Sequence, residues 1–261
     1  MHTQKHESRN KGYSMNINEI FESFQGEGPN TGKPSIFIRF SGCNLKCIYC
    51  DTKYTWLFGE KTLLNIRDSI PLEFHDKLGN EFYQKKDETH KMTIIDLIGN
   101  IKQYSATNIV ITGGEPLLQK KEIENILLHP YFENFNFEIE TNGTIEPIEL
   151  PTNKLQYNVS PKLANSFNKL ENRYIPSVLN KFKQKNSVFK FVVNESDDIT
   201  EIIKIQKELN IPGSQIYLMP EAISKEQLDK NGKMVAELAM LYNYNYSHRL
   251  HIQFYDDKRG V

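Results

Sequence analysis

The chain has 261 residues, of which 38% are hydrophobic, and a formal net charge of −1 from 32 basic and 33 acidic residues. This length is enough to bury a sizeable core, and the balanced charge gives no electrostatic reason to expect nucleic-acid or membrane-surface partners. No apolar run approaches the ~18–20 residues of a membrane helix. We therefore expect a soluble protein that binds neither nucleic acid nor membrane.

Residues 1–14 lack the apolar stretch of a secretory signal, and we expect them to be a disordered extension. The three cysteines all lie between Cys43 and Cys50. An odd, clustered set is a poor disulfide framework but is typical of a metal site in a reducing compartment. The expected location is the cytoplasm.

Strand-like runs alternate with segments of helical period along most of the chain. In chain order we expect a strand Ser35–Phe40, a helix Thr93–Tyr104, a strand Asn108–Thr112, a helix Lys120–Leu128, strands Phe135–Glu140, Leu155–Val159 and Val188–Val193, a helix Asp198–Leu209, a strand Gln215–Met219, a helix Ser224–Tyr242 and a last strand His251–Tyr255. Strands separated by helices predict βαβ units and a parallel sheet. The expected fold class is α/β, an incomplete (β/α) TIM-like barrel with about six parallel strands.

Residues 53–91 show no clean period. We expect them to form an insertion lying over one end of the barrel, with a hairpin of its own as one option. A loop of this length is usually functional or mobile. The predicted organisation is one domain over residues 15–261 that carries this insertion.

Polar or glycine-rich clusters follow five of the predicted strands: Gly113–Pro116, Thr141–Gly143, Ser160–Lys162, Asn194–Glu195 and Pro220–Glu221. Any one of them can be an ordinary turn. Active sites of parallel barrels assemble at the carboxyl ends of the strands. The succession therefore predicts an active site at that end.

The segment SGCNLKCIYCDT, residues 41–52, carries the spacing Cys-x3-Cys-x2-Cys. Three thiolates can hold three irons of a [4Fe–4S] cube and leave the fourth iron free for an external ligand, whereas ferredoxin cubes use four cysteines. The alternative is a zinc knuckle. Structural zinc takes four protein ligands, and no histidine lies near in the sequence to supply the fourth.

This cysteine motif after the first predicted strand, followed by Gly-Gly-Glu-Pro, resembles the radical S-adenosylmethionine (SAM) superfamily. Further segments narrow the resemblance to one family within this superfamily. They are FQGEG at 24–28, PSIFIR at 34–39, ITGGEP at 111–116, IETNGT at 139–144, VSPK at 159–162 and YLMPE at 217–221. Together these segments are similar to the 7-carboxy-7-deazaguanine synthase family. The resemblance covers nearly the whole chain from Met15, except the insertion.

The resemblance implies a radical SAM carbon–nitrogen lyase that contracts the ring of 6-carboxy-5,6,7,8-tetrahydropterin, with loss of ammonia, on the route to queuosine and related 7-deazapurines. It implies a [4Fe–4S] cluster, SAM and Mg²⁺ as cofactors, a flavodoxin or ferredoxin-type reductant, and a homodimer. A glycyl-radical-enzyme activase shares the cysteine spacing and is the alternative enzyme. A non-catalytic metal-binding protein is the alternative from another class.

Residue roles also follow from the resemblance. The implied cluster ligands are Cys43, Cys47 and Cys50, and the implied magnesium ligand is Thr52. The implied substrate contacts are Phe24, Gln25, Gly26, Glu27, Arg39, Thr112, His251 and the terminal carboxylate of Val261. The implied SAM contacts are Gly114, Glu115, Asn142, Ser160, Lys162 and Glu221.

Three of these roles have plain alternatives. Thr52 can be a hydroxyl that caps a loop, and Glu27 can merely shape the QGEG turn. Arg39 can be an inward polar residue on a strand. As a substrate ligand, its planar guanidinium would fork onto a carboxylate, which would also remove the cost of burying an unpaired charge.

Overall fold

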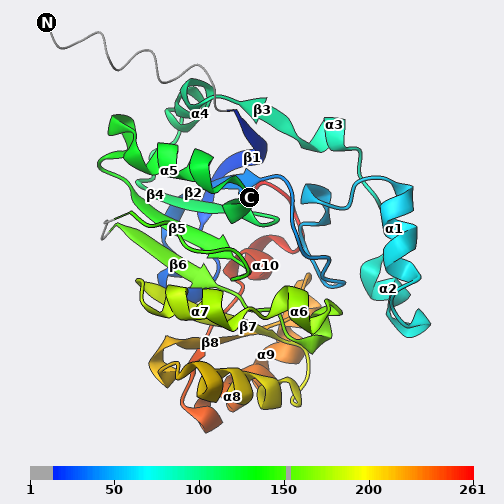
Figure 1. Cartoon of the computed structure of the whole chain (residues 1–261). Helices are drawn as coiled ribbons and strands as arrows, with labels where there is room; N and C mark the ends of the chain where they lie inside the picture. The colour runs from blue at the N-terminus through cyan, green and yellow to red at the C-terminus, as the bar shows by residue number, and fades with distance from the viewer. Residues whose placement is uncertain (1–13, 151–153) are drawn as a thin grey trace, which may run out of the picture.

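The computed structural model describes residues 14–150 and 154–261 (Figure 1). The predicted N-terminal extension therefore lies outside the described residues, apart from Ser14. No helix in the described ranges is long and apolar enough to cross a membrane.

The framework is one nine-stranded sheet with the order β3-β1-β2-β4-β5-β6-β7-β8-β9. Its strands are β1 Met15–Phe24, β2 Pro34–Phe40, β3 His90–Met92, β4 Asn108–Gly113, β5 Asn136–Thr141, β6 Leu155–Val159, β7 Ser187–Val193, β8 Ile216–Pro220 and β9 Asn245–Tyr246. All neighbours from β2 to β9 pair in parallel, whereas β1 pairs antiparallel with both β2 and β3.

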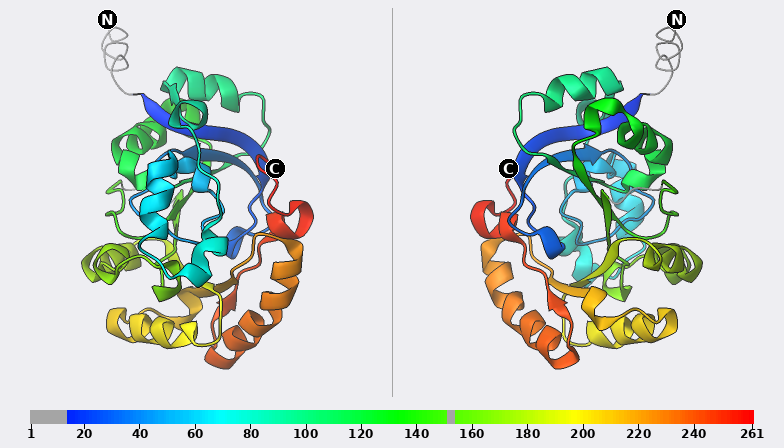
Figure 2. Two further views of the ribbon diagram at one scale, coloured as in Figure 1. Left: turned by 90° about the vertical axis from the view of Figure 1, so that its right-hand side faces the viewer. Right: turned by 90° about the vertical axis from the view of Figure 1, so that its left-hand side faces the viewer.

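The sheet curves without closing, because the end strands β3 and β9 do not pair with each other in the described structure (Figure 2). The six strands β2, β4, β5, β6, β7 and β8 match the six expected strands that lie before residue 220. The prediction of an incomplete α/β barrel is therefore confirmed. Strand β1 was not among the expected elements.

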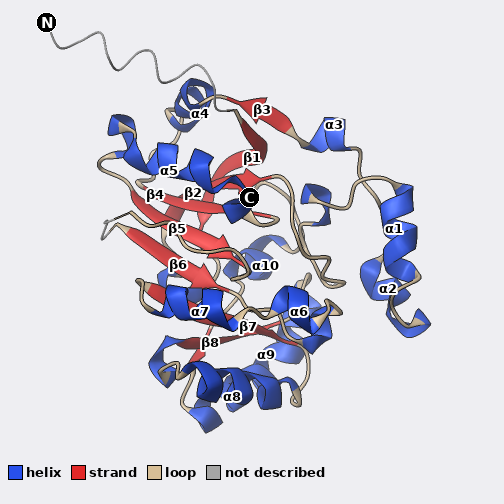
Figure 3. Ribbon diagram, in the orientation of Figure 1, coloured by secondary structure: helices blue, strands red, loops and turns tan. Residues whose placement is uncertain are grey.

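Helices cover the outer face of this curved sheet (Figure 3). They are α4 Ile94–Ile101, α5 Lys120–Leu128, α7 Pro176–Lys183, α8 Asp198–Leu209 and α9 Lys225–Tyr242, with the short helices α6 Leu170–Arg173 and α10 Leu250–Tyr255 nearer the barrel ends. Local sequence fixes some boundaries. Thr93 and Asp96 form a reciprocal capping box at the start of α4, and Ser224 caps α9.

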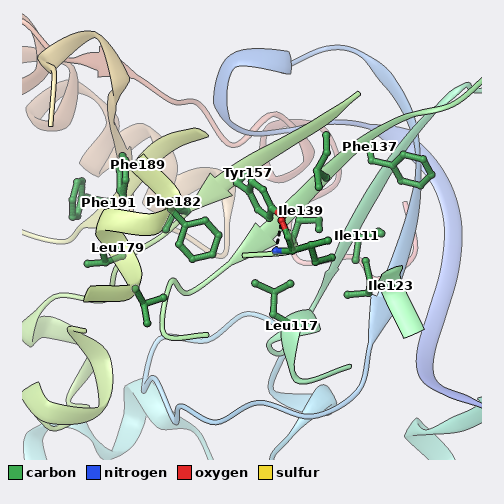
Figure 4. Packing of buried hydrophobic residues seen from close by; sticks show 14 of the residues in the cluster. Ile111, Leu117, Ile123, Phe137, Ile139, Tyr157, Leu179, Phe182, Phe189 and Phe191 are labelled. Carbon is green, nitrogen blue, oxygen red and sulfur yellow. Dashed lines mark hydrogen bonds between the residues drawn. The ribbon is translucent and has the colours of Figure 1, made fainter. Parts of the chain in front are cut away.

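The two faces of the sheet differ sharply in chemistry. The outer face is apolar: Ile139, Tyr157, Phe189 and Phe191 pack against side chains of the covering helices, such as Phe182 (Figure 4). Alternate residues on the same strands point into the barrel, and there the sequence places charge and amides. The helices thus bury the core outside the sheet and leave the interior to polar groups.

Two expectations are corrected by the structure. His251–Tyr255, expected as a last strand, lies within helix α10. The backbone of Leu250 donates to the carbonyl of Gly26, and Ile252 is buried with Leu228. The segment is therefore tied to the end of β1 and pairs along no strand, and Asp256 N donates to Ile252 O as in a helical turn.

The insertion also differs in detail. Residues 53–91 contain the helices α1 Glu60–Arg67, α2 His75–Leu78 and α3 Lys85–Glu88, and no hairpin appears in this described segment. Its only strand, β3, joins the edge of the main sheet. As expected, α1 and α2 lie across the carboxyl end of the barrel (Figure 2). Lys77 of α2 donates to Glu221 and to Asn194, which follow β8 and β7.

Candidate active site

The barrel interior carries a network of carboxylates and amides. Glu138 and Glu140 alternate along β5, and the amide of Gln25 donates to both, at 3.0 and 3.2 Å. Asn158 of β6 also donates to both carboxylates, at 3.1 and 2.7 Å. Such a network holds acceptor oxygens at fixed positions inside the barrel.

Lys190 is the buried cation of this network. Its side chain, 3% exposed, donates to Glu140 at 2.8 Å and to Glu27. The neighbouring charges outweigh burial and raise the pKa of Lys190, while the Lys190 and Arg249 cations hold the pKa of Glu27 well below its usual range. Burial raises the pKa of Glu140. At neutral pH the interior therefore holds ionised groups of both signs.

Arg249 joins the QGEG turn to the cysteine loop. Its Nε donates to Glu27 at 3.0 Å, and its Nη2 contacts Asp51, the residue directly after Cys50. Its Nη1 donates to the carbonyl of Ala222. One side chain thus connects the QGEG turn, the cysteine loop and the end of β8.

The cysteine loop follows β2 and is anchored at both ends. Gly42 N donates to Thr55 O, and Glu115 N donates to Gly42 O at 2.8 Å, which fastens the loop to the segment after β4. Cys47 is buried and Cys43 and Cys50 are half-buried, and all three are free thiols. Burial raises the pKa of the Cys43 thiol, and that of Cys47 to about 12.

The residues present fit a three-thiolate cluster. The loop offers three cysteines and the sequence contains no fourth. Each sulfur also receives or contacts a polar group: Leu45 N lies 3.4 Å from Cys43 Sγ, Asn168 Nδ2 lies 3.2 Å from Cys47 Sγ, and Trp56 Nε1 lies 3.3 Å from Cys50 Sγ. A closed structural zinc site takes four protein ligands, whereas this loop offers three thiolates.

The segment after β4 approaches the cysteine loop very closely. A Cβ on Gly114 would lie 2.3 Å from Gly42 O, so only glycine fits there. Glu115 is fully buried, and its carboxylate accepts bonds from Leu117 N, Thr141 Oγ1 and Asn142 N at 2.7–3.0 Å. Burial raises its pKa to about 7. These bonds fix the 141–144 turn, and Oε2, which has a single protein donor, keeps a lone pair open.

The remaining predicted SAM contacts line the carboxyl ends of other strands. Asn142 donates to Asn44 of the cysteine loop at 3.0 Å. Lys162 Nζ donates to Ser160 Oγ at 2.8 Å. Glu221 pairs with Lys77 of the insertion. These residues share one end of the barrel with the cysteine loop, as the pattern of strand ends predicted.

Arg39 lies on β2 beside Thr112, its register partner on β4. Its Nε donates to Glu19 at 2.6 Å, and the guanidinium lies 5.9 Å from the Tyr54 ring centroid. The expectation that a bound carboxylate alone would offset burial is therefore corrected, because Glu19 already pairs with this charge. Its Nη atoms have no hydrogen-bond partner among the described residues.

His251 packs directly on the QGEG turn. A Cβ on Gly26 would lie 2.1 Å from His251 Nδ1, which explains the need for glycine. His251 Nε2 lies 3.9 Å from Glu27. Burial and the Arg249 cation lower the pKa of His251 to about 4, so the imidazole is neutral at pH 7.

Three predicted residues lie at the margins. Phe24, at the end of β1, is 43% exposed, and strand alternation places it on the face opposite Gln25. Thr52 Oγ1 lies 3.5 Å from Cys50 Sγ. Val261 ends the tail whose Arg259 pairs with Glu19 and Glu88.

Several site residues were missed by sequence reasoning: Glu19, Asp51, Trp56, Glu138, Glu140, Asn168, Lys190 and Arg249. A signal for some was present, because Glu138 and Glu140 lie two residues apart in β5 and Lys190 is the single charge in the mostly apolar β7. Asn168 and Arg249 lie outside the expected elements, and nothing local marks them.

An open barrel with a three-cysteine loop at its carboxyl end defines a radical SAM protein. The family model of the Radical SAM superfamily matches residues 37–231. The superfamily implies a [4Fe–4S] cluster and SAM, which the three free thiols fit.

Curated relatives narrow the class. The chain is 30% identical to the 7-carboxy-7-deazaguanine synthase of Pyrobaculum aerophilum, over 94% of this chain and 97% of the relative. It is 32% identical to that of Halobacterium salinarum, over 94% and 92%. The crystal structure of QueE from Escherichia coli is similar with a TM-score of 0.65 and 27% identity, over 96% of this chain and 100% of that chain. The chain therefore belongs to the 7-carboxy-7-deazaguanine synthase family of radical SAM proteins.

Proposed function

We propose that this protein is a 7-carboxy-7-deazaguanine synthase. It contracts the ring of 6-carboxy-5,6,7,8-tetrahydropterin to 7-carboxy-7-deazaguanine and releases ammonia. The cluster and SAM, when bound, supply the 5′-deoxyadenosyl radical that starts the reaction. The relatives' shared name over nearly the whole chain supports this proposal.

The observation that carries it is the polar interior next to the cysteine loop. Glu140 and Glu27 present acceptor oxygens, which suit the amino and ring N–H groups along one edge of a pterin. Arg39 of β2 presents Nη donors that have no partner among the described residues, and such donors suit a carboxylate. A flat heterocycle whose N–H groups lie along one edge and which carries a carboxylate would match both sets of residues: its N–H groups would donate to the two glutamates, and its carboxylate would accept from Arg39.

The proposed roles follow this arrangement. Gly26, Glu27, Thr112, Arg39, His251 and Val261 surround the substrate, Gln25 orients Glu138 and Glu140, and Phe24 lies at the rim. Gly114, Asn142, Ser160, Lys162 and Glu221 form the SAM side, which Glu115 shapes.

Further parts of the proposal rest on the family resemblance and the sequence. They are a Mg²⁺ ion bound by Thr52 with substrate and water oxygens, a homodimer, a flavodoxin or ferredoxin-type reductant and a cytoplasmic location. A mixed oxygen shell with a single protein hydroxyl suits this hard ion. We also propose one radical SAM domain over residues 15–261, with 53–91 as its insertion.

The test is an anaerobic assay with reconstituted enzyme, SAM, dithionite and 6-carboxytetrahydropterin. We expect 7-carboxy-7-deazaguanine in excess over 5′-deoxyadenosine, because the conversion of this pterin to product and ammonia is redox-neutral and the hydrogen taken by the radical must be returned. We also expect about four irons per chain. Cys47→Ala should bind fewer irons and leave SAM intact, because no spare cysteine exists. Deoxyadenosine without ring-contracted product from this pterin would overturn the substrate, and SAM cleavage in Cys47→Ala would overturn the cluster assignment.

The activase alternative predicts another result. An activase would cleave SAM only with a large protein partner and would ignore the pterin. The enclosed network of Glu140 and Lys190 has no use in such a reaction.

A further inference from the structure

Two side chains outside the cysteine motif aim N–H groups at cluster sulfurs. Asn168 Nδ2 lies 3.2 Å from Cys47 Sγ, and Trp56 Nε1 lies 3.3 Å from Cys50 Sγ. Neither residue belongs to the motif: Asn168 lies in the connection after β6, and Trp56 lies near the start of the insertion. Trp56 lies six residues after Cys50, whereas tertiary structure brings Asn168 to Cys47 across 121 positions of sequence.

The orientation of the Asn168 amide is fixed by its neighbours. Its Oδ1 accepts from Lys46 N at 2.8 Å, so its Nδ2 must point the other way, toward Cys47. Its backbone carbonyl accepts from Arg173 Nε at 3.2 Å, and Arg173 is itself paired with Glu201 at 2.6 Å. The donor is therefore held rigidly against the sulfur.

The Trp56 indole has the same kind of constraint. The ring is 8% exposed and packs with Ile48, Leu57 and Leu63 in an apolar cluster between the cysteine loop and the insertion. Indole N–H can only donate, and burying it without an acceptor costs free energy. Cys50 Sγ is the one acceptor that the described residues offer it.

We propose that Trp56 and Asn168 are positioning residues that tune the reduction potential of the cluster through N–H···S hydrogen bonds. Such bonds withdraw electron density from the thiolates and stabilise the more negative, reduced state. Removing them should make the cluster harder to reduce. The insertion would then do more than cover the barrel, since it supplies one donor. This proposal rests on the cluster and not on the identity of the pterin.

The test is an EPR-monitored redox titration of reconstituted protein without SAM or substrate. Trp56→Phe keeps the aromatic ring but removes the N–H, and Asn168→Ala removes the amide. We expect each to retain about four irons and to lower the equilibrium constant for reduction threefold to tenfold, which is about 28–59 mV toward negative potential for one electron. Unchanged potentials in both variants would overturn the proposal.

Leu63→Val is the matched control, because Leu63 lies in the same apolar cluster as Trp56 but donates nothing. We expect its potential to equal that of the wild type. An equal shift in Leu63→Val and Trp56→Phe would assign the effect to packing and sink the hydrogen-bond explanation.

The chain contains a single tryptophan, which permits a sharper replacement. Growth with β-(3-benzothienyl)alanine exchanges only the indole N–H for sulfur and preserves ring shape. If Trp56→Phe loses its cluster, the analogue-containing protein is titrated in its place. Its reduction potential should shift toward negative values by the amount expected for Trp56→Phe. A wild type that binds no [4Fe–4S] cluster would instead refute the cofactor itself.

Discussion

The Lys190 ammonium and the Glu140 carboxylate form a buried ion pair of 2.8 Å inside the barrel, between two parallel strands that are not neighbours. Lys190 also pairs with Glu27 of the QGEG turn. One cation thus faces two carboxylates. Because these groups are buried, removing the cation or a carboxylate would leave uncompensated charge in the interior, which is costly. The pair fixes the acceptor oxygens that we assign to the substrate.

Lys190→Met should destabilise the protein by about 3–5 kcal/mol, because it leaves Glu140 buried without a cation and Glu27 with Arg249 alone. The loss should shrink as pH falls toward 5, since protonation neutralises the unpaired carboxylate. Urea denaturation at pH 8 and pH 5 measures both effects. Lys181→Met, at the exposed pair with Glu146, should cost less than about 1 kcal/mol. A similar cost for both lysines would contradict the buried-pair account.

Arg39→Lys should uncouple SAM cleavage from ring contraction. The lysine keeps the charge beside Glu19 but loses the planar fork whose Nη atoms remain free for a carboxylate. We expect less 7-carboxy-7-deazaguanine per 5′-deoxyadenosine, because a misplaced substrate no longer presents the right hydrogen to the radical. Both products are measured in the same reaction. An unchanged ratio with intact binding would mean that another residue aims the substrate.

Thr52→Ala should raise the Mg²⁺ concentration needed for half-maximal turnover, or lower the rate at limiting Mg²⁺. The reason is the loss of the single hydroxyl that we assign to the ion beside Cys50. Thr52→Ser keeps that hydroxyl and should behave close to wild type. Identical magnesium titrations of wild type and Thr52→Ala would show that the ion is held elsewhere.

His251 should make stability depend on pH between about 6.5 and 4. Its folded pKa, about 4, lies below the unfolded value near 6.5, so the unfolded chain binds more protons in this window. Its contribution is therefore present above pH 6.5 and is lost as pH falls toward 4. Because its side chain is 30% exposed, solvent screening reduces the effect to about 1–2 kcal/mol.

The measurement compares unfolding free energies of wild type and His251→Gln at pH 7.5 and pH 5. The wild type should lose more stability than the variant over this interval. His90→Gln, at an exposed position, serves as the control and should keep the wild-type pH dependence. An equal loss in wild type and His251→Gln would contradict the assigned pKa.

Local pattern was enough for most of the sheet. The short runs of β-branched and aromatic residues in SIFIRF and NIVIT predicted β2 and β4, because such residues favour a strand packed against helices. The same reasoning failed at His251–Tyr255, which lies in α10. The intrinsic strand preference of such a short segment is weak, so the hydrogen bond from Leu250 N to Gly26 O decides its conformation.

The sequence by itself determined the cysteine loop, the polar strand ends and the α/β order, because spacing and periodicity are local properties that each segment carries wherever it lies. Only the tertiary structure decided how the charged side chains inside the barrel are paired and which distant N–H donor reaches a cysteine sulfur. Lys190 meets Glu27 across 163 positions of sequence, and Asn168 meets Cys47 across 121. Such pairs depend on how the strands curve around a common interior, and no local pattern encodes that distance.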